Sequence, residues 1–153
     1  MNVIQMSTRG RDPLERILQQ ELENIHQFLE LLENEQNLLA SGNLDELALL
    51  VADKDRILDQ FAKLDARRNH VLNEAGLPEG ARGIKAWTSA DNNESTVTRD
   101  WEELLDLAEL AKQLNQANAT ITANWLQYTR QTLNALHEAA GRTTLYDTKG
   151  QIT

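Results

Sequence analysis

The sequence predicts an all-α protein, built as an elongated antiparallel coiled-coil helical hairpin with a long third helix and a flexible C-terminal tail. Aromatic residues make up only 5% of the 153 residues, which disfavours a sheet. The 7 Gly and 2 Pro lie mainly outside the segments with periodic apolar residues. Within those segments, apolar residues recur at steps of three and four, which is the period of a helix.

Three segments carry the start signal of a helix, an Asp or Asn followed three residues later by Glu. They are Asp12 to Glu15, Asn43 to Glu46 and Asp100 to Glu103. In such a capping box the first side chain accepts hydrogen bonds from free amides of the opening turn, and the Glu reaches back. The signals predict helices over about 13–40, 44–75 and 101–140.

These helices divide the chain into five parts. We expect a flexible N-terminus over 1–12, the hairpin over 13–75, a linker over 76–99, the third helix over 100–141 and a flexible tail over 142–153. Gly141 is the expected end of the third helix. The linker begins with "GLPEGARG", in which three Gly and one Pro interrupt any helix, and it continues with the polar stretch "IKAWTSADNNESTVTR".

The hairpin follows from the stripe of the first helix and from the connection after it. The stripe alternates steps of four and three along Leu18, Leu22, Ile25, Leu29, Leu32, Gln36 and Leu39. Ser41-Gly42-Asn43 then provides a left-handed stop at Gly42 and the next helix cap at Asn43. Because so short a connection joins only antiparallel neighbours, the first two helices should pack side by side.

Two basic residues, Lys54 and Arg68, interrupt the apolar face of the second helix. In one interpretation their aliphatic stems cover apolar surface while their charges reach acidic residues across the hairpin. In the other, they are polar residues of a structural seam that fix the alignment of the helices.

The third helix is apolar at both ends and rich in amides between Gln113 and Asn124. Asn115 and Asn118 are either polar residues of the helix seam or part of an amide cluster that faces a partner. Trp101 and Trp125 are either core residues or part of an exposed apolar groove for another helix.

Charge and composition exclude several classes of function. The net charge of −9 repels nucleic acid, no Cys is present, and no stretch has the roughly 18 apolar residues of a membrane span. We therefore expect a cytoplasmic protein with neither nucleic-acid binding nor membrane insertion. His26, His70 and His137 lie in three different helices without ligand spacing, and no phosphate-binding loop or nucleophile motif occurs. The sequence predicts no catalytic residues, metal site or cofactor.

Three stretches of the chain resemble the FlgN family of flagellar export chaperones. The first is "KDRILDQFAKLDARR", which matches the family pattern at Lys54, Ile57, Leu58, Phe61, Leu64, Arg67 and Arg68. The second is "NQAN", with Asn115, Gln116 and Asn118, followed by Trp125. The third is "TLYDTKGQ", which is similar to the family's tail at Leu145, Tyr146, Gly150 and Gln151, with Asp147 where relatives often have Gly.

The resemblance implies a chaperone without enzymatic activity whose clients are the hook–filament junction proteins FlgK and FlgL. Such a chaperone holds the C-terminal helical segments of its clients, prevents their premature assembly and delivers them to the export gate protein FlhA. It implies that Tyr146 docks on the gate. It also implies client binding by the third helix, through Leu114, Asn115, Asn118, Ile121, Trp125, Tyr128, Leu133 and Leu136.

A second hypothesis from the same apolar stripes is a non-catalytic structural coiled-coil adaptor or homo-oligomer. In that case, copies of the chain would cover the apolar faces that a slim hairpin leaves open.

Overall fold

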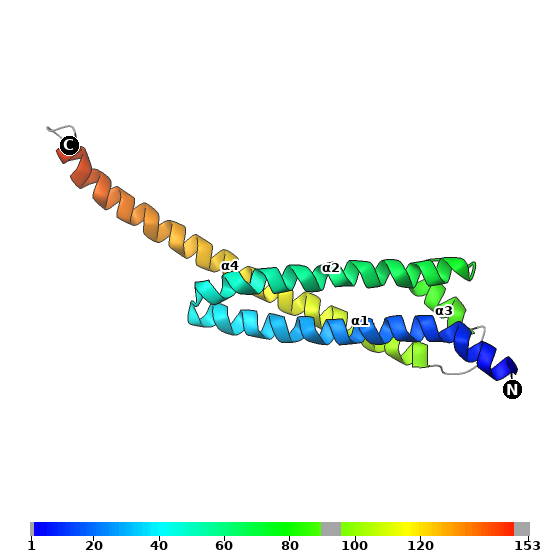
Figure 1. Ribbon diagram of the computed structural model, residues 1–153. Helices are drawn as coiled ribbons and strands as arrows, with labels where there is room; N and C mark the ends of the chain where they lie inside the picture. The colour runs from blue at the N-terminus through cyan, green and yellow to red at the C-terminus, as the bar shows by residue number, and fades with distance from the viewer. Residues whose placement is uncertain (1, 90–95, 149–153) are drawn as a thin grey trace. The chain divides into compact units, whose positions relative to one another are not determined.

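The computed structural model describes residues 2–89 and 96–148, and these residues form four α-helices (Figure 1). The helices are α1 (Asn2–Ser41), α2 (Leu44–Glu74), α3 (Ala81–Ser89) and α4 (Thr96–Thr148). No strand occurs among the described residues, so the predicted all-α class is confirmed. The chain divides into two compact units, residues 1–115 and 116–153, and the boundary between them falls within α4.

Helix α1 begins earlier than the sequence predicted. It starts at Asn2 and includes Pro13, so Asp12 is not an N-cap and the capping box at Asp12–Glu15 is wrong. Proline removes one backbone N–H from the hydrogen bonds of a helix. A single missing donor near one end did not stop this helix, which continues on both sides of Pro13.

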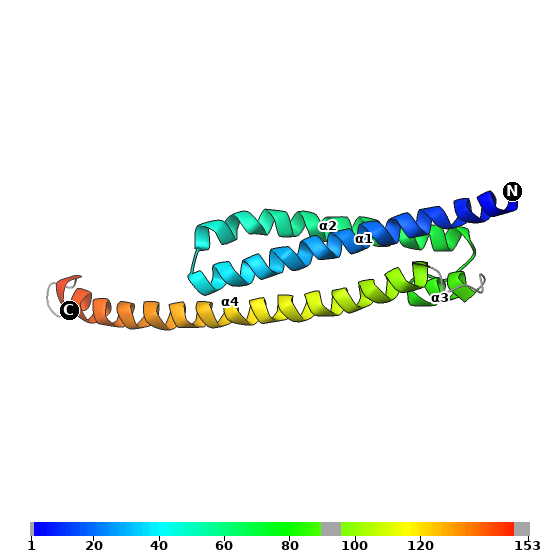
Figure 2. The ribbon, with the colours of Figure 1, turned by 90° about the horizontal axis from the view of Figure 1, so that it is seen from below.

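The hairpin connection agrees with the prediction. Gly42 adopts a φ of 70° between α1 and α2, where a side chain would be strained. The amide of Asn43 donates to the Leu38 carbonyl at 3.0 Å, and the amide of Gly42 to the Leu39 carbonyl at 3.3 Å, which is a Schellman end. The Asn43 side chain accepts from the Glu46 amide at 3.3 Å and begins α2. α1 and α2 therefore lie side by side and antiparallel (Figures 1 and 2).

The core of residues 1–115 lies where α1, α2, α3 and the start of α4 meet. Phe28 of α1 and Phe61 of α2 pack edge to face with ring centroids 5.5 Å apart. The buried cluster also draws on all four helices, through Leu14, Leu18, Ile25, Leu29, Leu32, Ile57, Leu72, Ile84, Val97, Leu104 and Ala111. The predicted stripe of α1 is buried except at Gln36, which is exposed, and at Leu22, which is half-buried.

The segment interpreted as a linker contains α3. Gly76, with a φ of 74°, ends α2 through a second Schellman arrangement, in which the Leu77 amide donates to the Leu72 carbonyl at 2.9 Å. Gly83 is buried, and a Cβ there would lie 1.9 Å from the Pro78 carbonyl oxygen. The glycines thus interrupt α2 as expected, but they also let the short helix α3 pack closely, with Ile84 in the core.

Helix α4 is longer than predicted at both ends. It begins at Thr96, so Asp100 lies inside the helix and is not its N-cap. It also passes through Gly141 and ends at Thr148, so the predicted stop at Gly141 is wrong. A glycine ends a helix when it adopts a left-handed conformation, and Gly141 is not among the glycines with positive φ.

Candidate partner-binding surface

The second unit exposes large apolar side chains along one helix segment, between residues 125 and 136 of α4. Of the residues predicted to bind a partner, four are exposed: Trp125 by 44%, Tyr128 by 68%, Leu133 by 47% and Leu136 by 58%. Their spacing of three, five and three places them on one broad side of the helix. We call these residues, with Leu126, the α4 apolar face.

Leu126 is a member that the sequence interpretation missed. It is exposed and lies seven residues before Leu133, so the two share one edge of the helix. The signal was available in the sequence. Leu126 follows Trp125 directly and precedes Leu133 by two helical turns, a pattern that the predicted stripe through Trp125 does not include.

The other predicted members of the partner surface are less accessible. Leu114 is partly buried against the core of residues 1–115. Asn118 is only 2% exposed and Ile121 is half-buried. Asn115 is exposed, and its side chain accepts a hydrogen bond from the Lys54 ammonium at 2.8 Å. The structure therefore does not present the predicted set as one uniformly exposed surface.

Lys54 connects three helices of the first unit. Its ammonium also contacts the Glu35 carboxylate of α1 at 3.2 Å. Because the charged groups are partly buried, they are less screened than an ion pair on the open surface. Lys54 thereby holds the amide of Asn115 next to the acidic partner from α1.

Arg68 lies in a more deeply buried cluster. Its guanidinium contacts the carboxylates of Glu21 from α1 and Asp65 from α2. It also lies 4.9 Å from the ring centroid of Trp101, a cation–π distance. Burial raises the pKa of the Glu21 carboxyl, and the hydrogen bond and charge of Arg68 oppose that rise. Arg68 thus links α1, α2 and the start of α4.

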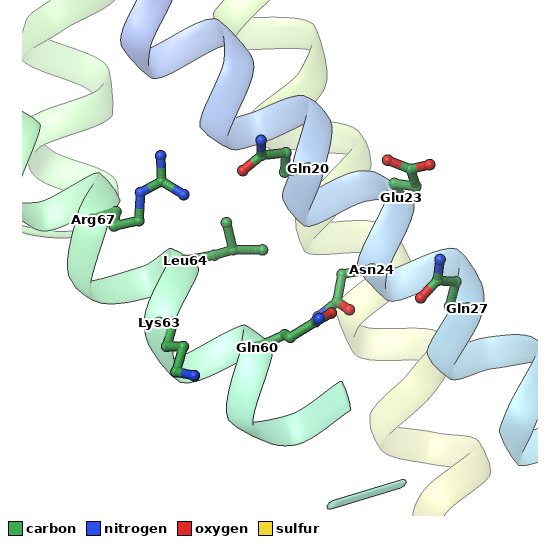
Figure 3. A pocket seen from close by; sticks show the side chains of 8 residues that line it. All are labelled: Gln20, Glu23, Asn24, Gln27, Gln60, Lys63, Leu64 and Arg67. Carbon is green, nitrogen blue, oxygen red and sulfur yellow. The ribbon is translucent and has the colours of Figure 1, made fainter. Parts of the chain in front are cut away.

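A shallow polar groove of about 300 Å³ lies between α1 and α2. Figure 3 shows that Asn24 of α1 and Gln60 of α2 point toward one another across it. Asn24 is buried and donates to the Ile57 carbonyl at 3.3 Å. The remaining lining residues are mostly polar: Gln20, Glu23, Gln27, Lys63, Leu64 and Arg67. The groove carries no constellation for catalysis.

A second groove, of about 410 Å³, is lined by α1, α2 and α4 within residues 1–115. Its apolar lining includes Phe61 and Ala62 of α2 and Leu105 and Ala108 of α4, and Asp65 also lines it. We call it the α2–α4 groove. Leu58, which precedes Ala62 by one turn, is exposed, as are Leu44 and Val51 at seven-residue intervals before it.

Neither a membrane span nor a metal site is found in the part of the chain that was searched. None of the helices there is long and apolar enough to cross a bilayer. Within the same residues, no group of three or more His, Cys, Asp or Glu side chains could hold a metal ion. The backbone of Tyr146 lies within α4, but its side chain is outside the described residues.

Comparison with known proteins gives one match. The model of the family described as FlgN protein matches residues 6–153, which is nearly the whole chain. No curated protein and no solved structure matches the chain. The match includes both units and every surface described above.

Proposed function

The chain belongs to the FlgN family of flagellar export chaperones, and from this premise we propose that it binds the C-terminal helical segments of FlgK and FlgL. The α4 apolar face is the observation that supports this proposal. A client helix with an apolar stripe would cover side chains that are otherwise 44 to 68% exposed to water, at Trp125, Leu133, Leu136 and Tyr128. Such cover prevents premature assembly of the client without any chemical step.

Within this proposal the predicted residues have different roles. Trp125 and Tyr128 supply large apolar contact area, and the exposed leucines extend it along the helix. Ile121, which is half-buried, lies at the edge of the face. Leu114, Asn115 and Asn118 would act at the boundary with the first unit rather than at the centre of the client surface.

Delivery to the export gate is the second part of the proposal. We place the gate contact, to FlhA, at Tyr146, because the tail sequence around it resembles that of the family. Release then requires only that the gate compete with a client held by apolar contact. We also place the protein in the cytoplasm, where its clients are made. The FlgN family consists of chaperones rather than enzymes, and no catalytic step is proposed.

The direct test of client binding is a pull-down of the full chain with C-terminal segments of FlgK and FlgL. Trp125→Ala should weaken capture by about tenfold or more, since truncating a central aromatic anchor commonly removes more than 1.4 kcal/mol. Leu49→Ala, on an exposed leucine of α2, is the control. Capture that is equal for the native chain and Trp125→Ala would contradict the proposal.

The two tyrosines of α4 allow a reciprocal test of the gate contact. Tyr146→Ala should weaken binding to FlhA while leaving capture of the FlgK segment unchanged. Tyr128→Ala should do the reverse, because Tyr128 belongs to the α4 apolar face. Equal loss of client capture in both variants would refute separate roles for the two positions.

The second candidate function, a structural adaptor or homo-oligomer, is favoured by the exposed leucines of α2. Mass in solution with and without client distinguishes it from the chaperone. A tight oligomer that does not change its mass when the FlgK or FlgL segment is added would favour the adaptor.

A further inference from the structure

We propose that the open side of the α1–α2 hairpin is a docking site for a short acidic helix of another protein. This side carries two adjoining grooves. One is the polar groove of about 300 Å³ described above, and the other, of about 490 Å³, is lined by the two helices nearer the start of α1. Gln20 and Arg67 line both, so we treat them as one surface, the α1–α2 groove.

The α1–α2 groove is separate from the side of the hairpin on which α4 packs. The start of α4 contacts the Arg68 guanidinium through Trp101 and joins the core through Leu104. Arg67, the preceding residue of α2, lines the open groove instead. In Figure 3 the groove faces the viewer and α4 passes behind the hairpin. A helix in the groove would therefore complete a bundle with α1, α2 and the start of α4 without displacing any of them.

The lining residues indicate the size of the occupant. They extend over 13–27 of α1 and 60–71 of α2. At about 1.5 Å per residue the stretch of α1 is roughly 20 Å long, which matches a helix of about four turns. Ile17 and Leu64 form an apolar floor, and both are already buried. Because the floor offers little free apolar area, the polar side chains of the rim decide which occupant binds.

The charge of the groove is opposite to that of the chain as a whole. The chain has 15 basic and 24 acidic side chains. The groove is lined by Arg16, Lys63 and Arg67, and Glu23 is the one acidic residue among its lining residues. A local basic surface attracts carboxylates, whereas the net charge of −9 repels long polyanions such as nucleic acid. These charges favour a short acidic segment of a protein.

Arg67 is the residue best placed to contact a carboxylate of the occupant. Its side chain is exposed, lines both parts of the groove, and has no ion-pair partner among the described residues. Lys63, in contrast, already contacts the Asp59 carboxylate at 3.0 Å. A guanidinium can donate two parallel hydrogen bonds to one carboxylate, so a Glu or Asp of the occupant would satisfy Arg67.

A buried amide adds a second point of recognition. Asn24 is 4% exposed, and its side-chain nitrogen donates to the Ile57 carbonyl at 3.3 Å. Its Oδ1 is buried and accepts no hydrogen bond within the described part of the chain. Gln60 points toward Asn24 across the groove (Figure 3). Because an unpaired buried acceptor costs free energy, a hydroxyl or amide donor from the occupant would be favourable at this point.

The inference goes beyond the proposed binding of clients. The α1–α2 groove lies in the first unit and the α4 apolar face in the second, and they have no residue in common. The two surfaces can therefore be tested by separate substitutions.

Two synthetic peptides test the charge preference by fluorescence anisotropy with the purified full chain. Both are amphipathic helices of about four turns with leucines on one side, and their other positions carry mainly glutamate or mainly lysine. The glutamate peptide should bind about fivefold more tightly or better, and added salt should weaken it. The net charge of −9 favours the opposite order. Equal binding, or tighter binding of the lysine peptide, overturns the proposal.

Charge reversal locates the contact. Arg67→Glu should weaken binding of the glutamate peptide by about fivefold or more, since it replaces an attraction by a repulsion. Arg67 is exposed, so circular dichroism should show an unchanged helical content. The matched control is Arg56→Glu, because Arg56 is 69% exposed on the same helix and lines neither part of the groove.

Two further measurements separate this site from client binding and from a general anion site. Trp125→Ala should leave binding of the glutamate peptide unchanged, and Arg67→Glu should leave capture of the FlgK segment unchanged. Loss of peptide binding in Arg56→Glu or Trp125→Ala as large as in Arg67→Glu overturns the proposal. So does single-stranded DNA that binds the native chain as tightly as the glutamate peptide does.

Discussion

At the scale of single residues, Arg68 shows how one buried side chain joins three helices. Its guanidinium contacts Glu21 from α1 and Asp65 from α2, and lies over the Trp101 ring of α4. Taking two charged groups out of water is costly, so a buried ion pair adds little net stability, but loss of one partner leaves the other charge uncompensated. A slip of α2 along α1 would leave Arg68 and Glu21 buried without each other.

The Glu21 carboxyl predicts a dependence of stability on pH. Its folded pKa lies above 4.5, chiefly because of burial, so between 4.5 and that folded pKa the folded protein binds more protons than the unfolded chain. The stabilising contribution of Glu21 is therefore complete below pH 4.5 and is lost as the pH rises through the folded pKa.

The measurement compares the free energy of unfolding of the native chain and Glu21→Gln by urea titration at a series of pH values. The native chain should lose stability relative to Glu21→Gln as the pH rises above 4.5. A relative gain over the same range would mean that attraction to Arg68 outweighs the cost of burial. Glu30→Gln, an exposed position on α1, controls for the change in net charge.

At the scale of elements, two glycines that were both predicted to end a helix behave differently. Gly42 adopts a positive φ and ends α1, whereas Gly141 lies within α4. Both are single glycines after helix-forming residues, so the glycine alone could not separate them. What distinguishes Gly42 is the Asn43 cap that follows and the packing of α2 back on α1. After Gly141 the described residues continue as α4 to Thr148, without a second helix that packs back on it.

The two glycines should therefore respond oppositely to alanine. Gly141→Ala should stabilise the end of α4 by about 1 kcal/mol, because no atom lies within 4 Å of the added Cβ and glycine weakens a helix interior. Gly42→Ala should destabilise the hairpin by about 1 to 2 kcal/mol, since its φ of 70° is unfavourable for a side chain. Hydrogen exchange of α4 amides and thermal unfolding measure the two effects. Stabilisation by Gly42→Ala would contradict the assigned turn.

The hairpin could be predicted from sequence because the stripe of α1, the Gly42 stop and the Asn43 cap all indicate the same connection. Helix α3 could not be predicted from the sequence, because its nine residues lie among glycines and polar side chains and show too little apolar periodicity. Its stability depends on Ile84 packing in the core and on the close approach of Gly83 to Pro78. For the candidate surface, sequence identified Trp125 and Tyr128, but it could not show that Asn118 is buried.

At the scale of the whole molecule, buried and exposed apolar residues are divided unevenly. The core cluster draws its members from residues 14–111, whereas residues 116–141 contribute none to it. The first unit is thus stabilised by burial, and the second by the backbone hydrogen bonds of one helix. Long helices without packed partners open easily in water.

Hydrogen exchange should reveal this division. Amides of residues 116–141 in a dilute, monomeric sample should exchange at least about a hundredfold faster than those of the buried stretch 17–32. Addition of a FlgK segment should slow the second set while leaving the first nearly unchanged. Equal protection of both stretches in the free monomer would contradict the view that the second unit lacks a core of its own.

The three tryptophans lie in different surroundings, which gives the native chain its own optical reporters. Trp87 of α3 packs partly against the core, and Trp101 faces the Arg68 guanidinium. Trp125 lies in the other unit and is open to water. Its emission should shift to the blue when any apolar partner covers it, whereas emission from Trp101 should respond to the separation of α4 from the hairpin. Single-tryptophan variants would therefore report separately on the occupancy of the α4 apolar face and on the integrity of the helical bundle.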